Sequence, residues 1–182
     1  AVSMSRQVIE GGDGVTPGHM GVSQADAKKL PFPDKVFDRV LMFDVVEHLH
    51  PWELHEALLE VRRVLKDDGR FIVHTAPNIW YDRFAYPIVR RLRGAMGQGA
   101  QYPKDPRQFL VSINEHVHVN EQSLWSMQKT LRNAGFKGKV WLESPPQTWG
   151  RSPLDVMRRF VFATPPFRWF FQREVFAIAA KS

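Results

Sequence analysis

Carboxylates and imidazoles are grouped near the middle of this sequence. Asp44, Glu47 and His48 form the pattern D-x-x-E-H, and His116 and His118 follow later in the chain. Carboxylates combined with imidazoles suit magnesium, manganese or a metal that prefers nitrogen. Imidazoles are also the commonest general bases, which makes His48 and His116 the candidate catalytic residues. Histidines that only hydrogen-bond the loop backbone remain an open alternative, and we assign no metal ligand.

Asp44 stands out because of its surroundings. It is the one charge after Arg39 in residues 39–46 (RVLMFDVV), an otherwise apolar run. Such a run is typical of a strand buried on both faces of a parallel sheet. A buried charge is costly unless it is paired. The pattern therefore predicts that Asp44 serves a site rather than the core.

Two stretches combine basic residues with aromatic ones. Their basic residues are Arg83, Arg90, Arg91, Arg93, Lys104 and Arg107 in the first, and Arg151, Arg158, Arg159, Arg168 and Arg173 in the second. Aromatic side chains interleaved with arginine can stack on bases or lie at a membrane interface. The net charge of +6 also favours anionic partners. An ordinary core with a solvated basic face is the alternative.

Length and composition exclude several classes. A chain of 182 residues with 43% hydrophobic and 24% charged residues is typical of one globular domain. It contains no cysteine, which excludes disulfides, thiolate zinc sites, iron–sulfur clusters and a cysteine nucleophile. No apolar run approaches the roughly 20 residues of a membrane-spanning helix. No signal peptide is recognisable at the start of the sequence, and we expect a cytoplasmic location.

The central part of the chain predicts a strand–helix–strand unit. Strands are expected at 39–43 and 70–74, and a helix begins at Pro51, where a missing N–H costs nothing. Its apolar residues recur at helical spacing, at Leu54, Ala57, Leu58, Val61, Val64 and Leu65. We expect Gly69 to end this helix as a left-handed cap.

The remaining elements are predicted from shorter signals. A short basic helix is expected near 84–93, and Asn120 is the expected N-cap of a helix with Leu124, Gln128, Leu131 and Ala134 on one face. Gly135 closes that helix. Strands are expected at 139–143 and 174–180, with an amphipathic helix at 153–162.

Five segments carry a family resemblance in their order and spacing. They are QADAKKLPFPDKVFDRV at 24–40, VVEHL at 45–49, EVRRVLKDDG at 60–69, TAPN at 75–78 and LRNAGF at 131–136. Together they resemble class I S-adenosylmethionine-dependent methyltransferases of the type that shares D-A-x-x-L-P-F-P-D-x-x-F-D. The resemblance extends from about residue 1 to the last strand.

The resemblance implies an α/β, Rossmann-like sheet of seven strands with flanking helices and an antiparallel last strand. Its third strand would be 21–24, and 39–43, 70–74, 139–143 and 174–180 would be the fourth to seventh. Residues 1–182 would form one domain. Within it, residues 76–114 would be an insertion that covers the acceptor, and 144–173 a basic aromatic segment.

The first twenty residues allow two interpretations. In the first, residues 1–5 (AVSMS) end the second strand, and the first strand with its glycine-rich cofactor loop lies upstream of this chain. In the second, residues 8–14 (VIEGGDG) are that loop, but too few residues then separate it from L-P-F-P-D. The spacing favours the first, in which Ser3 and Met4 lie at the cofactor ribose.

The same resemblance implies further cofactor contacts. Asp26 would accept a hydrogen bond from the adenine amino group, and Ala27 would offer its backbone N–H to the ring. Phe43 and Asp44 would face the methionine part of the cofactor. Two branches of the family hold a divalent metal near a motif like D-x-x-E-H, but the motif also occurs in members without one, and we expect no metal.

The implied function is methyl transfer from S-adenosylmethionine, which leaves S-adenosylhomocysteine, to a small-molecule, lipid-linked or glycan-type acceptor. Peripheral contact with a membrane is compatible with the basic stretches. One alternative is a truncated, non-catalytic binding module of the same fold. A second is an RNA methyltransferase, which the charge favours and the lack of a base-binding motif such as N-P-P-Y disfavours.

Overall fold

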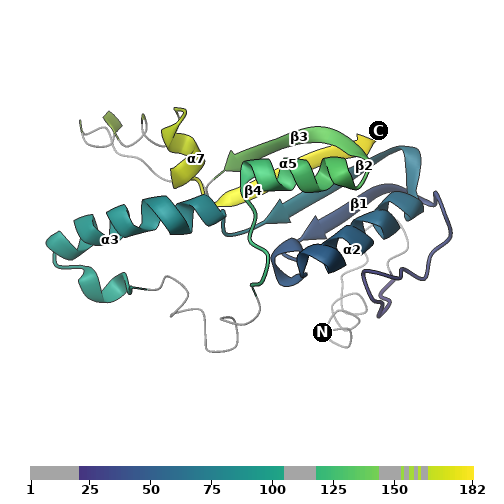
Figure 1. The fold of residues 1–182 in the computed structure, drawn as a ribbon, viewed down its shortest axis with the longest axis horizontal. Coiled ribbons are helices and arrows are strands. Elements are labelled where there is room, and N and C mark those ends of the chain that lie inside the picture. The colour runs from purple at the N-terminus through teal and green to yellow at the C-terminus, as the bar shows by residue number, and fades with distance from the viewer. Residues whose placement is uncertain (1–20, 105–117, 144–152, 154–155, 158–159, 161–163) are drawn as a thin grey trace, which may run out of the picture.

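The computed structural model describes residues 21–104, 118–143, 153, 156–157, 160 and 164–182. Four strands form one sheet in the order β1-β2-β4-β3: β1 (Phe37–Phe43), β2 (Leu65–Thr75), β3 (Phe136–Glu143) and β4 (Glu174–Lys181). The described α-helices that accompany the sheet include α2 (Pro51–Val64), α3 (Tyr86–Ala95), α5 (Leu124–Asn133) and α7 (Phe167–Phe171). η1 (Val46–His48) and η3 (Gly99–Gln101) are short 3-10 helices, and η2 (Tyr81–Ala85) is a short π-helix that leads into α3 (Figure 1).

The sheet is mixed, as the sequence predicted. β1 and β2 are parallel and are joined by α2, whereas β4 runs antiparallel to both β2 and β3. The four strands predicted at 39–43, 70–74, 139–143 and 174–180 are confirmed. The expected strand at 21–24 is wrong for this structure. These residues make no ladder with β1, and the nearest pairing is an isolated bridge between Asp26 and Lys29.

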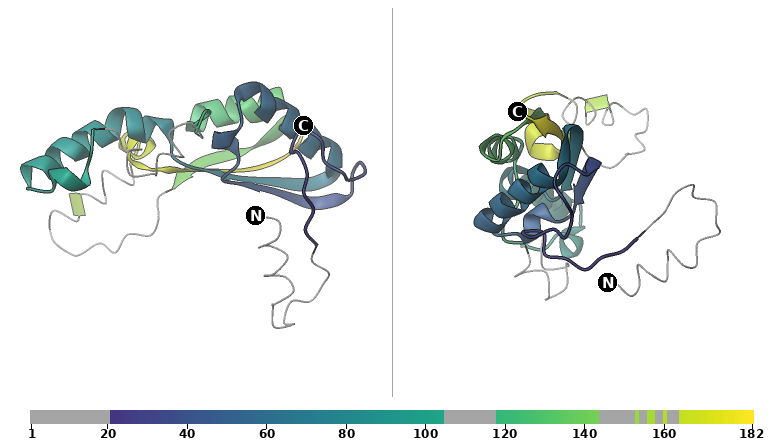
Figure 2. Two further views of the ribbon diagram at one scale, coloured as in Figure 1. Left: turned by 90° about the horizontal axis from the view of Figure 1, so that it is seen from below. Right: turned by 90° about the vertical axis from the view of Figure 1, so that its right-hand side faces the viewer.

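The two central helices lie on one face of the sheet (Figure 2, left). α2 buries Leu54, Ala57, Leu58, Val61 and Val64, which is the stripe predicted from the spacing. α5 adds Met127 and Leu131. These side chains pack against Phe71, Val73, Phe136 and the buried positions of β4 to form the apolar core. Removing that surface from water is the main force that holds α2 and α5 to the sheet.

The predicted helix ends need two corrections. α2 ends at Val64, because Leu65 is already extended with ψ 138° and begins β2. Gly69 therefore lies inside β2, where an added Cβ would come within 2.7 Å of the Leu65 side chain. The N-cap of α5 is Ser123 rather than Asn120, since the Ser123 hydroxyl accepts from the Ser126 N–H at 3.1 Å. Gly135 ends α5 with φ +77°, as expected.

The opposite face of the sheet carries a row of rings that crosses all four strands. Phe43, His74, Phe176 and Trp141 follow one another with ring centroids 6.2, 4.6 and 5.6 Å apart. The predicted basic helix near 84–93 is present as the end of η2 and most of α3. The helix predicted at 153–162 lies largely outside the described residues. Among the helices of the described part of the chain, none is long and apolar enough to cross a membrane.

The segment before β1 is tied along α2. The Arg63 guanidinium donates to the backbone oxygens of Leu30 and Phe32 at 3.0 and 2.8 Å. It also pairs with Glu60, whose carboxylate accepts from the Leu30 N–H at 2.8 Å. Hydrogen bonds from Arg63 and Leu30 lower the pKa of Glu60 to about 2. The L-P-F-P-D and E-V-R-R-V sequences therefore form one structural unit.

Candidate functional site

Polar side chains gather where the parallel strands β1 and β2 end. Among the residues that the structure describes, the buried polar ones are Glu47, Thr75, Asn78, Gln122 and Ser123. Glu47 follows β1, Thr75 ends β2, and Asn78 lies three residues farther along. Gln122 is joined to the same region, since its backbone oxygen accepts from the Ile79 N–H at 3.1 Å. The carboxyl ends of strands are the usual place for ligands in open α/β sheets.

Asp44 turns the chain out of β1. Its φ of +52° lies in the left-handed region, which aspartate tolerates better than most residues. Its backbone N–H donates to the His74 oxygen at 3.1 Å, and its carboxylate Oδ1 lies 3.0 Å from His74 Nδ1. The side chain is 64% exposed, so the apolar run does not bury this charge, and the role of Asp44 in a site stays a prediction. The tight turn places the carboxylate outside the core.

Glu47 is the buried carboxylate of this edge. It is 2% exposed, and its Oε2 accepts from the Thr75 hydroxyl at 2.7 Å. Its backbone oxygen accepts from the N–H groups of Val119 and Asn120 at 2.9 and 3.1 Å. The segment before α5 is thereby fixed against η1.

Two imidazoles lie beside Glu47. The rings of His48 and His118 are 4.8 Å apart, and one donor atom each from Glu47, His48 and His118 lie within 4.8 Å of one another. His118 Nδ1 also lies 3.9 Å from Glu121 Oε1. Three such donors could hold a divalent cation. Equally, a buried carboxylate beside an exposed imidazole could orient that imidazole as a base.

Only part of the predicted cluster comes together in this way. The sequence pattern grouped Asp44, Glu47, His48 and one later histidine. The structure brings Glu47 and His48 to His118, while Asp44 pairs with His74 instead. His116 lies outside the described residues, as do Ser3 and Met4.

Asp26 and Ala27 lie near the start of α2. Lys28 connects them to it, because its ammonium is 3.0 Å from Glu53 Oε1 and 5.7 Å from the centre of the Trp52 ring. The exposed Asp26 carboxylate accepts from the Lys28 N–H at 2.9 Å, and this bond lowers the pKa of Asp26. Ala27 is half-buried and packs against the core. Since α2 begins after β1 ends, both residues belong to the same edge of the sheet.

Thr75, Asn78 and His74 are site residues that the motif analysis missed. The Asn78 side chain donates to the backbone oxygens of Trp169 and Gln172, both at 2.9 Å, and so ties the chain after β2 to α7. A signal was available in the sequence. Polar residues follow directly on the apolar strand F-I-V in F-I-V-H-T-A-P-N, where a carboxyl-end site would be expected.

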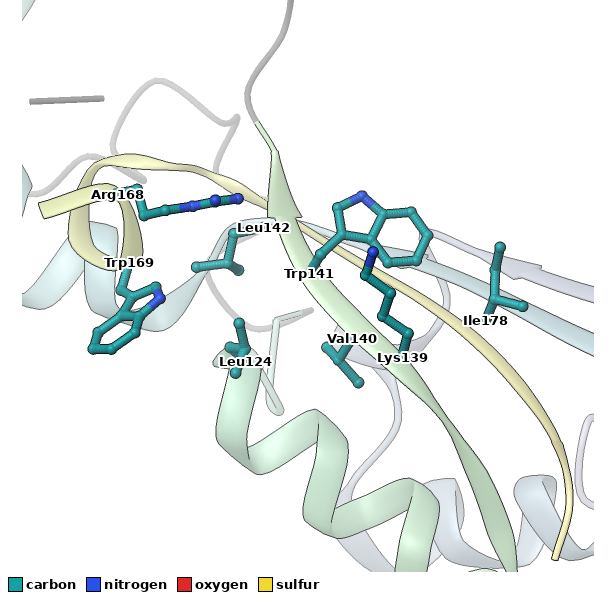
Figure 3. Close-up of a pocket in the computed structure, with 8 residues that line it drawn as sticks. All are labelled: Leu124, Lys139, Val140, Trp141, Leu142, Arg168, Trp169 and Ile178. Atoms are coloured by element: carbon teal, nitrogen blue, oxygen red, sulfur yellow. The ribbon is translucent and has the colours of Figure 1, made fainter. Parts of the chain in front are cut away.

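A separate hollow lies at the far edge of the sheet. Its volume is about 620 Å³, and its lining residues come from β3, β4, α5 and α7: Leu124, Lys139, Val140, Trp141, Leu142, Arg168, Trp169 and Ile178 (Figure 3). None of the described residues that line it carries a carboxylate or an imidazole. In the strand order, β2 lies between β1 and the two strands that line this hollow, β4 and β3. The edge at β1 and β2 is therefore the better candidate for chemistry.

Sequence comparisons connect the chain to methyltransferases. Residues 2–73 match the family described as a methyltransferase domain. The ubiquinone/menaquinone biosynthesis C-methyltransferase UbiE of Chromobacterium violaceum is 33% identical over 126 residues, which cover 65% of this chain and 47% of that protein. UbiE of Paraburkholderia phytofirmans is 28% identical over 120 residues, covering 62% and 45%. The chain spans about half the length of these curated relatives.

Comparisons with solved structures give the same fold. A SAM-dependent methyltransferase from Methanosarcina mazei aligns with a TM-score of 0.57 at 14% identity, over 100% of this chain and 77% of that one. The YcgJ protein from Bacillus subtilis aligns with a TM-score of 0.52 at 20% identity, over 99% and 76%. Together with the mixed sheet and its helical layer, these alignments confirm the predicted α/β, Rossmann-like fold.

Proposed function

We propose, from the chain's similarity to methyltransferases, that it is a class I S-adenosylmethionine-dependent methyltransferase and transfers a methyl group to a small-molecule or lipid-linked acceptor. The proposal rests on the group of polar side chains at the edge of the sheet where β1 and β2 end. The residues that match the methyltransferase family include β1 and most of β2. At this edge the buried carboxylate of Glu47 lies beside the imidazoles of His48 and His118, and the exposed carboxylate of Asp44 pairs with His74. A glycan-type acceptor would use the same chemistry.

The cofactor would lie along this edge. We assign its contacts to Ser3, Met4, Asp26, Ala27, Phe43 and Asp44. The described members of this set fit such a ligand, because Asp26 and Asp44 present exposed carboxylates that can accept N–H groups. Phe43 is 49% exposed and adds an apolar surface beside them.

The chain's own residues have to orient the acceptor and remove its proton. When bound, S-adenosylmethionine supplies an electrophilic methyl group on a sulfonium. We assign proton removal from an acceptor O–H, N–H or C–H to His48 or His116. Holding the acceptor in line for attack is the larger contribution, since well-aligned reactants gain roughly 7–11 kcal/mol in favourable cases.

Divalent metal is not part of this proposal. Glu47 already accepts a hydrogen bond from Thr75 at 2.7 Å, and His118 lies beside Glu121. The group is therefore held together by its own contacts. We expect transfer to continue in the presence of a chelator.

The acceptor side of the site is assigned to the two basic aromatic stretches. Residues 76–114 would cover the acceptor, and residues 144–173 would form the second wall of a single domain. Exposed apolar side chains on both stretches, including Phe84, Ile88 and Phe160, favour a lipid-linked acceptor and peripheral contact with a membrane. We place the enzyme on the cytoplasmic side.

Calorimetric titration with S-adenosylhomocysteine tests the proposal. We expect saturable binding that Asp44→Ala weakens and that the exposed control Glu56→Ala, on α2, leaves unchanged. A chain that folds but does not bind would support the non-catalytic module instead. Incubation with labelled S-adenosylmethionine, with and without chelator, then compares short quinones, polyprenyl phosphates and RNA as acceptors.

A further inference from the structure

α3 presents an apolar stripe to solvent. It follows η2 and extends away from the end of the sheet (Figures 1 and 2). Phe84, Ile88, Leu92 and Met96 stand four residues apart and are 49%, 52%, 60% and 57% exposed. Side chains at this spacing lie on one side of a helix. Ile88 and Leu92 therefore form an exposed apolar face along α3, and Met96 extends it beyond the end of the helix. Phe84, in η2, lies at the inner end of this face, where its ring contacts Phe170 of α7 edge-on with the centroids 5.6 Å apart.

The other side of α3 is occupied by the chain that follows it. Tyr86 donates from its hydroxyl to the Pro103 oxygen at 2.9 Å, and Arg90 Nε donates to the Tyr102 oxygen at 3.2 Å. Arg93 bonds Gln98 Oε1 at 2.9 Å and lies over the Tyr102 ring. These contacts hold residues 98–103 against the side of α3 that carries Tyr86, Arg90 and Arg93.

The charge around the stripe is mainly positive. Residues 82–105 contain four arginines and one lysine against two aspartates, Asp82 and Asp105, at the two ends of the segment. Arg91, an exposed residue next to the stripe by helical position, can reach past it with its long side chain. Such a segment complements a negatively charged surface.

We propose that α3 is a docking element that lies in the surface of an anionic lipid bilayer, with Phe84, Ile88, Leu92 and Met96 among the lipid tails. An amphipathic helix with an apolar side and a basic side is the form that binds in this plane. At 10 residues, or about 15 Å, α3 is too short to cross the bilayer. Being a projecting helix rather than a groove, it fits a flat surface better than it fits a second helix or strand.

This inference deepens the proposed function, because it names the surface where a lipid-linked acceptor would be met. It can fail separately, since vesicle binding is measured without methyl transfer. The binding of S-adenosylhomocysteine, in turn, is measured without vesicles. The two results therefore distinguish a failed docking element from a failed methyltransferase.

The test is cosedimentation of the chain with phosphatidylcholine vesicles, with and without about a third of phosphatidylglycerol. We expect binding only to the anionic vesicles, weakening several-fold between about 0.05 and 0.3 M salt. Ile88→Glu with Leu92→Glu should reduce it at least tenfold. Arg91→Gln should reduce it two- to fivefold. The matched control is Leu59→Glu on α2, a similarly exposed leucine outside α3, which should bind as the original chain does.

Circular dichroism and S-adenosylhomocysteine titration establish that each variant is folded. Equal vesicle binding by the double variant and the control would overturn the proposal. So would the absence of binding to any vesicle. A concentration-dependent dimer that the double variant dissociates would show instead that the stripe contacts a second copy of the chain, and would also overturn it.

Discussion

The two ends of the parallel strands β1 and β2 are charged in different ways. At their amino ends, carboxylates meet amines: Asp38 pairs with Lys66 at 2.8 Å and Asp67 pairs with Lys35 at 2.7 Å. At their carboxyl ends, carboxylates meet imidazoles and a hydroxyl, as Asp44 does with His74 and Glu47 with Thr75.

This difference in partners indicates that the amino ends of the strands stabilise the fold and that the carboxyl ends take part in chemistry. A carboxylate beside a lysine or arginine is neutralised at every physiological pH, so its bonds hold the fold and little else. An imidazole can gain or lose a proton near neutral pH, which leaves its carboxylate partner able to accept from a ligand. The expectation that follows is simple: changes at the carboxyl ends alter activity, and changes at the amino ends alter stability.

The largest effect is expected at Glu47. Glu47→Ala removes the carboxylate beside His48 and His118, and we expect methyl transfer to fall by about a hundredfold or more. It also leaves the Thr75 hydroxyl without its acceptor, so the free energy of unfolding should fall by about 1–3 kcal/mol. Turnover and urea denaturation measure the two losses.

Glu47→Gln separates the loss of turnover from the loss of stability. The amide oxygen can still accept from Thr75, so stability should be mostly restored while turnover stays low. If the amide variant turned over as fast as the original chain, the charge of Glu47 would have no part in the chemistry. The carboxyl ends of β1 and β2 would then differ from the amino ends in their residue types but not in their role.

Glu60 is the structural counterpart of Glu47. Together with Arg63 it forms a clamp that ties α2 to the segment before β1. Glu60→Gln weakens its pair with Arg63 and its bond to the Leu30 N–H. We expect a loss of about 2 kcal/mol in the free energy of unfolding, the size usual for a hydrogen-bonded charge. Affinity for S-adenosylhomocysteine, measured on the folded variant, should stay within about twofold; a large loss would mean that the clamp shapes the cofactor site.

The same clamp predicts the response to acid. Folding lowers the pKa of Glu60 from 4.5 to about 2. A lowered carboxyl pKa contributes stability that is fully present above the unfolded value and is lost as the pH falls toward the folded value. Between about pH 5 and 2, stability should therefore drop more steeply in the original chain than in Glu60→Gln. Parallel curves from denaturation at each pH would contradict this.

The sequence predicted most of the sheet and its helices correctly, and less of the candidate site. Local patterns were sufficient for four strands and for the body of α2, since an apolar run or a stripe such as Leu54, Leu58 and Val61 is decided by its own residues. The strand expected at 21–24 came from the family resemblance alone, and the structure does not form it. The end of α2 was misplaced because Gly69 has two uses, as a left-handed cap and as a small residue in a strand. The structure uses the second, which depends on the contact with Leu65.

The candidate site is formed by contacts between residues that lie far apart in the chain. Glu47 and His118 are 71 positions apart, and nothing local says that His118 rather than Asp44 would complete the group. The pairing of Asp44 with His74 follows from the register of β1 against β2, where Phe43 lies beside His74. Register is a property of two strands, so a motif within one strand could not reveal it.

Asp26 gives a smaller effect at the carboxyl end. Its carboxylate is exposed and accepts from the Lys28 N–H, so losing it should scarcely change stability. If it also accepts from the cofactor, Asp26→Ala should weaken S-adenosylhomocysteine binding about five- to tenfold. Asp34→Ala, at the amino end, is the control and should bind normally. Unchanged affinity in a folded Asp26→Ala would remove this residue from the site.

The smallest effect is expected from the exposed pair at the start of the strands. Asp38 and Lys66 are 72% and 41% exposed, and water screens a pair of this kind so that it adds little to stability. Asp38→Asn should therefore shift the urea midpoint only slightly, and added salt should abolish even that shift. Turnover should be unchanged, because the pair lies at the other end of β1 from Glu47. A measurable loss of turnover in Asp38→Asn would contradict the division between the two ends, since a surface pair with so little energy can affect chemistry only if the strands transmit it.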